Sequence, residues 1–307
     1  MILSRSGFVI NGDPFYSPKI AISPFSLASP QIPLKVSQKG MKVFDDIFRS
    51  VEWSFTKSGK NAIEIALREL GVGKNDEVWI QTSSQNSYVS RCVTEMISNF
   101  CSWSMVESEK TKVIYFIHDF GEDGTTRLAE FQNRETPIIE DAAYGLITAI
   151  EGNWDFSRSE YILFSFPKVF EMQLGGILCG SITRKAEQND LLDLVARGSS
   201  NWIIQHEEIF ARRKVNYAVL KREFERLGFK TNRELLFYEN PGVFMFSTES
   251  GFPLDELKFF FNNHGCESSV FYGRLSYFLP THQNLNERTI MYMADLLDAF
   301  IVENPND

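Results

Sequence analysis

Between about residue 55 and residue 180 the chain alternates short apolar runs with segments of helical spacing. Residues 113–117 form a continuous apolar run, which is typical of a strand buried inside a parallel sheet. Ala62, Ala66 and Leu70 recur at helical spacing, and Gly71 follows where that helix is expected to end. Further short strands are predicted at residues 77–80, 137–140, 161–164 and 176–179. The last of these follows its neighbour closely enough to return antiparallel, so we predict a mixed, mostly parallel sheet.

The pattern changes after residue 205 and predicts a second domain. A long charged amphipathic helix is expected at 207–227, a strand at 243–246, and helices at 254–264 and 288–300. We therefore predict two domains: residues 1–205 as an N-terminal arm plus a large α/β domain with helices on both faces of its sheet, and residues 206–307 as a small α+β domain. The first 40 residues contain several prolines and serines, which predicts an irregular arm with short strands at most.

Composition limits the functional classes that fit this organisation. The 307 residues carry a net charge of −9, which argues against nucleic acid as a partner because phosphate backbones require a basic face. The four cysteines are widely spaced and form no C-x-x-C pair, so no metal site is predicted. No stretch approaches the roughly 18–20 apolar residues of a membrane span, and the N-terminus lacks the apolar region of a secretion signal. These features predict a soluble cytoplasmic protein without a membrane partner.

Polar residues follow several of the predicted strands, and ligands of open parallel sheets bind beyond such carboxyl ends. Ser58, Gly59, Lys60 and Asn61 stand at the start of a predicted helix, where free amides and the helix dipole attract an anion. The same residues also suit a plain helix cap. Tyr88, after a polar loop, could stack on a flat ring or simply pack in the core.

The two remaining strand ends carry a carboxylate and an amine. Asp141 follows an apolar strand and precedes two alanines, which leave room for a flat ligand, although a turn-capping aspartate would look the same. Lys168 comes just after the strand that ends near Ser165. Burial there would lower the pKa of Lys168 and make its amine a nucleophile. A lysine in a solvated loop would have no such role. An anion cradle, an aromatic ring, a carboxylate and a lysine together are what a pyridoxal phosphate site requires.

The order and spacing of these segments resemble the DegT/DnrJ/EryC1/StrS family of fold-type-I aminotransferases, which depend on pyridoxal 5'-phosphate. SGKNAIEIALRELGVGKNDEVWI resembles the family's opening "SGT-x-AL…ALGVGPGDEVI", and IIEDAAYG resembles "VIEDAAQA". HDFG stands where the family has "HLYG", FSFPKVFEMQLGGIL resembles "FSFxxxKNLTTGEGGxx", and FLPTHQNLNERTI resembles "LPLHP-x-LTEEEV". The seven-residue step from Lys168 to Gly175 agrees with the lysine motif. The likeness runs from about residue 58 to residue 300.

The resemblance implies a role for each matching residue. Lys168 would form the Schiff base with the cofactor and then carry protons, and Asp141 would pair with the pyridinium nitrogen. Tyr88 would stack on the ring, with Gln85 as the alternative if the alignment gap is misplaced. Further cofactor contacts are implied for Ser58, Gly59, Lys60 and Asn61 at the phosphate, joined by Ser165, and for Tyr144 at the ring hydroxyl. The family also implies a homodimer, glutamate as amino donor, and a keto group on a nucleotide-linked sugar, used in polysaccharide biosynthesis, as acceptor.

Three departures from the family pattern keep other functions open. Tyr144 stands where the family has glutamine, and only two residues separate Ser165 from Lys168 where four are common. The family's "GYNYR"-type segment is reduced or missing between residues 184 and 210. One alternative is therefore a pyridoxal phosphate enzyme for a non-sugar amine or amino acid. The other is a shortened, non-catalytic relative that serves as a binding protein.

Overall fold

The computed structural model describes residues 2–3, 9–10, 20–26, 32–122, 124–152, 154–183, 189–231 and 240–304. The chain forms two compact units. The larger contains Phe25–Glu207 and Tyr238–Asn240, and the smaller contains Met1–Pro24, Glu208–Phe237 and Pro241–Asp307. The sequence pattern assigned the whole N-terminal arm to the large domain, whereas this division groups its first 24 residues with the C-terminal part of the chain.

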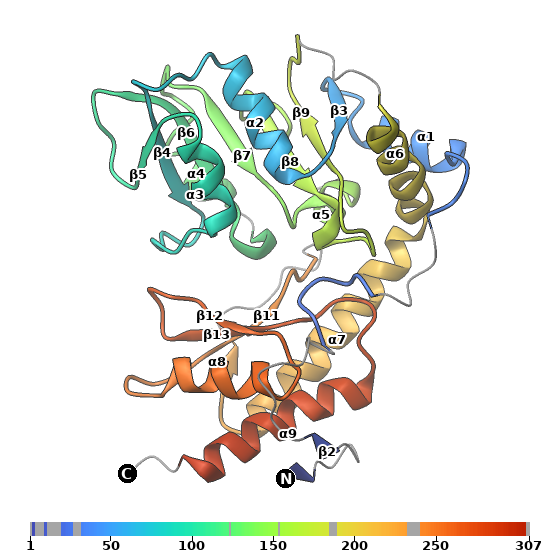
Figure 1. The fold of residues 1–307 in the computed structure, drawn as a ribbon, viewed down its shortest axis with the longest axis vertical. Coiled ribbons are helices and arrows are strands. Elements are labelled where there is room, and N and C mark those ends of the chain that lie inside the picture. The colour runs from blue at the N-terminus through green and yellow to red at the C-terminus, as the bar shows by residue number, and fades with distance from the viewer. Residues whose placement is uncertain are drawn as a thin grey trace. The chain divides into compact units, whose positions relative to one another are not determined.

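The larger unit is built on a seven-stranded mixed sheet with the strand order β3-β9-β8-β7-β6-β4-β5 (Figure 1). Its strands are β3 (Trp53–Thr56), β4 (Glu77–Thr82), β5 (Ser102–Ser104), β6 (Thr111–Ile117), β7 (Ile138–Asp141), β8 (Tyr161–Ser165) and β9 (Gly176–Cys179). Strands β4 to β8 are parallel, and β9 runs antiparallel to both β8 and β3. The predicted mostly parallel sheet and the antiparallel return are confirmed. Strands β3 and β5 were not predicted.

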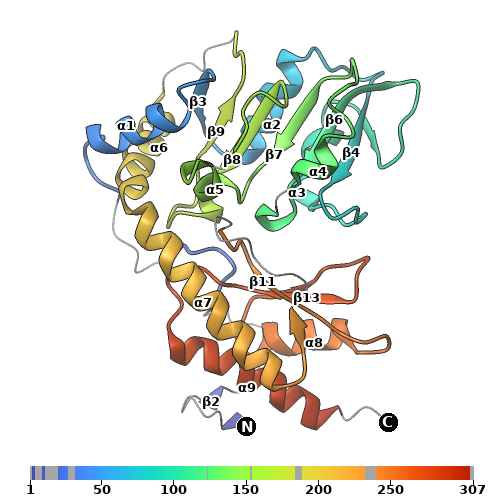
Figure 2. The same cartoon turned by 180° about the vertical axis from the view of Figure 1, so that it is seen from behind.

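Helices cover both faces of this sheet, as predicted. They are α1 (Gln38–Ile47), α2 (Gly59–Glu69), α3 (Arg91–Ser98), α4 (Thr125–Leu128), α5 (Leu146–Ile150) and α6 (Asp190–Trp202). Successive strand residues point to opposite faces, so Val113 packs in the core beneath α2 and α3 while Ile114 packs with Leu128 of α4. Figure 1 shows α2 in front of the sheet, and the reverse view places it behind the strands (Figure 2).

An aromatic cluster joins α1 to the β3 edge of the sheet. Phe44 of α1 and Phe48, which caps its C-terminus, lie with ring centroids 5.7 and 5.5 Å from that of Trp53. The ring of Phe166 lies 6.0 Å from that of Phe44. Ser37 caps α1, because its side chain accepts a hydrogen bond from the Gly40 amide. The helix therefore forms at the end of the predicted irregular arm, where the apolar spacing was too short to predict it.

The smaller unit has a four-stranded antiparallel sheet in the order β10-β11-β13-β12. Its strands are β10 (Lys230–Thr231), β11 (Phe244–Ser247), β12 (Ser269–Val270) and β13 (Ser276–Leu279). Its helices are α7 (His206–Arg226), which starts at the end of the larger unit, α8 (Leu254–Asn263) and α9 (Glu287–Glu303). The Ile20 amide donates to the Gly265 carbonyl at 3.0 Å, which attaches the start of the chain to this unit. A short antiparallel pair, β1 (Ile2–Leu3) and β2 (Val9–Ile10), precedes it.

Gly175, just before β9, occupies a backbone conformation with φ +97°, which residues with side chains rarely adopt. A Cβ atom there would lie 2.7 Å from the Phe166 ring and 2.9 Å from Val195. We expect Gly175→Ala to lower the free energy of unfolding by about 2–4 kcal/mol, because backbone strain adds to overpacking. Urea unfolding measures this loss. Gly71→Ala is the matched control, since its φ is +64° but no atom lies within 4 Å of the added carbon.

Candidate functional site

The carboxyl ends of adjacent parallel strands carry the predicted catalytic residues. Asp141 is the last residue of β7, and Lys168 ends a 3₁₀ turn, Phe166–Lys168, that follows β8 directly. Because β7 and β8 are parallel neighbours, both residues lie side by side at the edge formed by the carboxyl ends of the parallel strands. Lys168 lowers the pKa of Asp141, and Asp141 in turn raises the pKa of Lys168, so the two side chains are within electrostatic range of each other.

Lys168 is held against Tyr144. Its Nζ lies 5.2 Å from the centre of the Tyr144 ring, over the ring face, and it also donates a hydrogen bond to the Tyr144 side chain. The pKa of Lys168 is raised, and Tyr144 is the largest cause. Its effect outweighs that of burial, which lowers the pKa. The predicted lowering of the Lys168 pKa is therefore wrong, because that prediction considered burial alone and not the phenol beside the amine.

Asp141 is buried and its carboxylate has fixed partners. The Tyr115 hydroxyl donates to Oδ2 at 2.8 Å, and the Ala143 amide donates to Oδ1 at 3.0 Å. Burial raises the pKa of Asp141, while these two hydrogen bonds and the nearby His118 and Lys168 lower it. The sequence did not single out Tyr115, because its place in the apolar run of β6 looks like that of any core aromatic.

A second buried polar group lies behind Asp141, at the preceding position of β7. Glu140 has no exposed surface, and its Oε2 lies 2.9 Å from Nε2 of His118. Its Oε1 accepts a hydrogen bond from Ser159 at 2.7 Å, and Arg158 lies 3.7 Å away. His118 is 2% exposed within this network. The network fixes the strand end that carries Asp141.

The start of α2 lies next to the end of β8, where an anion would be held. The Ser58 side chain caps the helix by accepting from the Asn61 amide at 3.2 Å, and Asn61 accepts from the Lys57 amide at 3.1 Å. The amides of Gly59 and Lys60 are first-turn donors that a helix cannot pair internally. A Cβ atom at Gly59 would lie 3.4 Å from the Ser165 hydroxyl oxygen, so this hydroxyl and the helix start face one cradle.

The segment between β4 and α3 supplies the remaining candidates. Tyr88 is half-buried, and burial, followed by the proximity of Tyr144, raises its pKa. Gln85 is exposed, with φ +60°. Helix α3 begins at Arg91, so Tyr88 precedes the helix. Cys92, which the sequence considered only as a metal ligand, raises the pKa of Lys168 and so lies near it.

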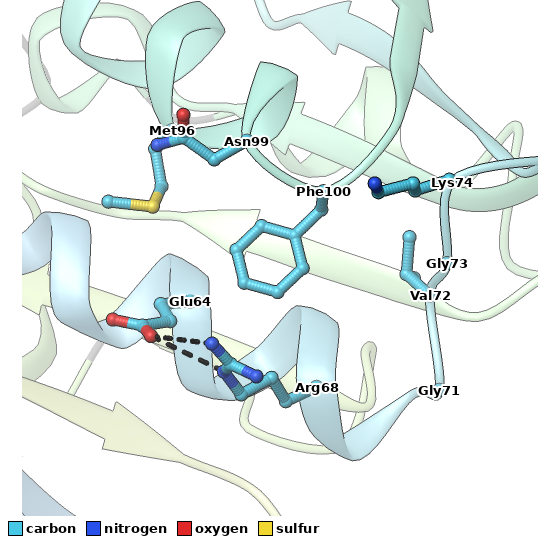
Figure 3. Close-up of a pocket in the computed structure, with 9 residues that line it drawn as sticks. All are labelled: Glu64, Arg68, Gly71, Val72, Gly73, Lys74, Met96, Asn99 and Phe100. Atoms are coloured by element: carbon cyan, nitrogen blue, oxygen red, sulfur yellow. Dashed lines mark hydrogen bonds and ion pairs between the residues drawn. The ribbon is translucent and has the colours of Figure 1, made fainter.

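A cavity of about 550 Å³ lies between the C-terminal ends of α2 and α3 (Figure 3). Arg68 faces it, paired with Glu64 at 3.1 Å and lying 5.1 Å from the centre of the Phe100 ring. None of the predicted site residues lines this cavity. Within the described ranges, no group of three or more His, Cys, Asp or Glu side chains could bind a metal ion, and no helix is long and apolar enough to cross a membrane.

Comparison with known proteins gives a structural likeness without a sequence match. No family model matches the chain, and no curated protein is similar to it in sequence. The aminotransferase TlmJ from Streptoalloteichus hindustanus has a TM-score of 0.69 at 13% identity, over 87% of this chain and 92% of that one. Spr1654 from Streptococcus pneumoniae, in its PLP-form, has a TM-score of 0.67 at 16% identity, over 95% and 99% of the two chains.

A third solved structure is described by the family name that the motifs suggested. It is a DegT DnrJ EryC1 StrS aminotransferase from Brucella abortus, with a TM-score of 0.62 at 14% identity, over 86% of this chain and 90% of that one. At such low identity the likeness establishes the fold. The described part of the chain thus has the α/β architecture of the fold-type-I aminotransferases, as its sequence motifs predicted.

Proposed function

We propose that the protein is a pyridoxal phosphate-dependent aminotransferase that moves an amino group from glutamate to a keto group of a nucleotide-linked sugar. The observation that carries this proposal is the placement of Lys168 and Asp141 at the carboxyl ends of the adjacent parallel strands β8 and β7, beside the cradle at the start of α2. The structural likeness to TlmJ and to the PLP-form of Spr1654 supports it. The motif resemblance supplies the sugar and the donor.

The side chains present suit pyridoxal phosphate. An anion cradle of Gly59, Lys60 and the Ser165 hydroxyl would hold the phosphate. A buried carboxylate that is held by two hydrogen bonds would face the ring nitrogen, and a lysine amine would reach the aldehyde. Ser58 and Asn61 use their side chains to cap the helix, so we assign them the role of shaping this cradle. Tyr88 remains the proposed stacking ring.

When bound, the cofactor supplies an electron sink for the carbon that loses its proton. Lys168 would anchor the cofactor and then move that proton with its Nζ atom. Because Tyr144 stabilises the ammonium form of Lys168, the amine must give up a proton before it can act as a nucleophile. The ionised Asp141 would keep the ring nitrogen protonated, and its hydrogen bonds from Tyr115 and Ala143 hold it in place for this.

The visible spectrum of the protein before and after glutamate tests the cofactor and the donor together. We expect pyridoxal phosphate to give a visible absorbance band that glutamate abolishes, because amine transfer converts the cofactor to its amino form. An excess of a keto acid should restore the band. A protein that stays colourless when saturated with pyridoxal phosphate refutes the proposal. A stable band that no amine changes favours the non-catalytic binding protein.

The acceptor needs a separate experiment, because Tyr144 replaces the family glutamine and the 184–210 region departs from the family. The described part of that region is helix α6, a turn at Ile203–Gln205 and the start of α7. The amino form of the enzyme should regain its visible band with nucleotide-linked keto sugars. Recovery with simple keto acids alone would replace the sugar with a non-sugar substrate. We further propose that the protein is cytoplasmic and forms a homodimer. Sedimentation of the purified protein checks the homodimer.

A further inference from the structure

Phe120 follows β6 and occupies a backbone conformation that large side chains avoid. Its φ is 51° and its ψ is 28°, inside the 3₁₀ turn Asp119–Gly121. A left-handed residue that is neither glycine nor asparagine is strained and persists only where the surroundings enforce it. Strained residues of this kind cluster at functional sites.

The turn is fixed by hydrogen bonds to the loop that follows β4. Oδ2 of Asp119 accepts from the Ser84 hydroxyl at 2.6 Å and from the Ser84 amide at 3.2 Å. The Asp119 amide donates to the Ser83 hydroxyl at 3.0 Å. Burial raises the pKa of Asp119 to about 6 and outweighs the hydrogen bonds from Ser83 and Ser84, which lower it. The conformation of Phe120 is therefore held by contacts between two strand ends.

The enforced turn brings two consecutive residues against Tyr144. The ring centroid of Phe120 lies 5.8 Å from that of Tyr144, with an interplanar angle of 55°. Gly121, also left-handed with φ +81°, passes so close that a Cβ atom there would lie 3.2 Å from the Tyr144 Cβ. Tyr144 is thus packed on one side by the turn, and on its ring face it meets the Lys168 amine at 5.2 Å.

We propose that Phe120 is a positioning residue, whose strained turn fixes the Tyr144 ring so that its face and hydroxyl hold the Lys168 amine. This inference deepens the proposed function, on which the catalytic importance of Lys168 rests. The chain from Phe120 through Tyr144 to Lys168 joins the ends of β6, β7 and β8, which are neighbours in the sheet. No group of Phe120 itself needs to touch a substrate.

The arrangement predicts a titration effect on Lys168. The groups that influence its pKa are Tyr144, Cys92 and Asp141, all of which raise it, and Tyr144 is the largest. Removing the Phe120 ring frees Tyr144 to move, so its stabilisation of the ammonium form weakens and the pKa of Lys168 falls. A fall of one unit raises the reactive amine fraction about tenfold at a pH below both midpoints.

Competitive acetylation of the cofactor-free protein over a pH series, read by mass spectrometry, measures this midpoint. We expect Phe120→Leu and Phe120→Gly to lower the Lys168 midpoint and Phe120→Tyr, which keeps the ring, to leave it unchanged. Tyr144→Phe should lower it at least as far. The exposed Lys110 of the same sample is the internal control and should not shift in any variant.

Phe120→Gly separates positioning from folding, because it removes the ring while relieving the backbone strain. An unchanged Lys168 midpoint in this variant and in Phe120→Leu overturns the proposal, and so does an unchanged midpoint in Tyr144→Phe. The readout needs no cofactor. A protein that binds no pyridoxal phosphate but shows the shift would therefore refute the proposed function and still support the positioning role.

Discussion

We expect Lys168→Ala to abolish the visible absorbance of the pyridoxal phosphate-loaded protein and to lower kcat by at least about 10⁴-fold. The side-chain amine is the atom that would bond to the cofactor, and the same amine would carry the proton between the reacting carbons. General acid–base catalysis alone contributes about 10²–10⁴-fold, so losing both roles costs at least the upper end of that range. Absorbance spectra and steady-state rates measure the two effects in one preparation.

Two control variants separate this chemistry from general damage. Lys168→Arg keeps a cation that can lie over the Tyr144 ring but cannot form the bond to the cofactor, so it should be equally inactive. Lys110→Ala removes an exposed lysine in the turn before β6 and should leave both readouts unchanged. A Lys168→Ala protein that retains the visible band and turns over glutamate would show that another amine holds the cofactor.

The sheet could be predicted because its central strands are buried on both faces. A continuous apolar run such as 113–117 is typical of a strand covered by helices on both sides, and β6, β7, β8 and β9 lie where the sequence predicted them. Strand β3 was missed because Trp53–Thr56 packs only partly buried at the edge of the sheet, so it lacks such a run. Helix α6 was also not predicted, and Val195 is its only buried large apolar side chain.

The placement of Lys168 and Asp141 at neighbouring strand ends could be predicted from the sequence, but the electrostatics around Lys168 could not. Lys168 and Asp141 follow strands in a known order, so parallel pairing alone brings them to one edge. The sign of the Lys168 pKa shift depends instead on the direction of the Tyr144 ring. That direction is set by Phe120, 24 positions earlier in the chain, through a left-handed turn that no local propensity favours. Local sequence patterns do not predict such contacts between strand ends that are far apart in the chain.

The buried partners of Asp141 favour its charged form in the fold. The fixed hydrogen bonds from Tyr115 and Ala143 offset part of the cost of burying a carboxylate, and Lys168 adds a nearby opposite charge. The pKa of Asp141 is nevertheless raised, so the ionised form is less favourable in the folded protein than in the unfolded chain. The ionisation of Asp141 therefore destabilises the fold. This destabilisation develops as the pH rises above the pKa that Asp141 has in the unfolded chain, and it is fully present above the pKa that Asp141 has in the folded protein.

Asp141→Asn should therefore lose activity without losing stability. The amide nearly matches the carboxylate in size. Its oxygen can accept from the Ala143 amide, and the Tyr115 hydroxyl can rotate to accept from its nitrogen, but it carries no negative charge for the ring nitrogen. We expect kcat to fall about 10²–10³-fold, the usual cost of removing a group that stabilises developing charge. Because Lys168 is intact, the visible band should remain, and the pKa of Lys168 should fall because Asp141 is one of the groups that raise it.

Stability measurements make the argument for Asp141 decisive, because the two possible causes of lost activity predict opposite results. If Asp141 is mainly structural, Asp141→Asn unfolds at lower urea concentration than the parent at pH 7. If it is a cofactor partner whose ionisation the fold disfavours, the variant unfolds at the same or higher urea concentration, and the gap narrows as the pH falls. Asp155→Asn, at an exposed turn, is the matched control and should leave kcat unchanged. A kcat for Asp141→Asn equal to that of the parent would remove Asp141 from the proposed cofactor site.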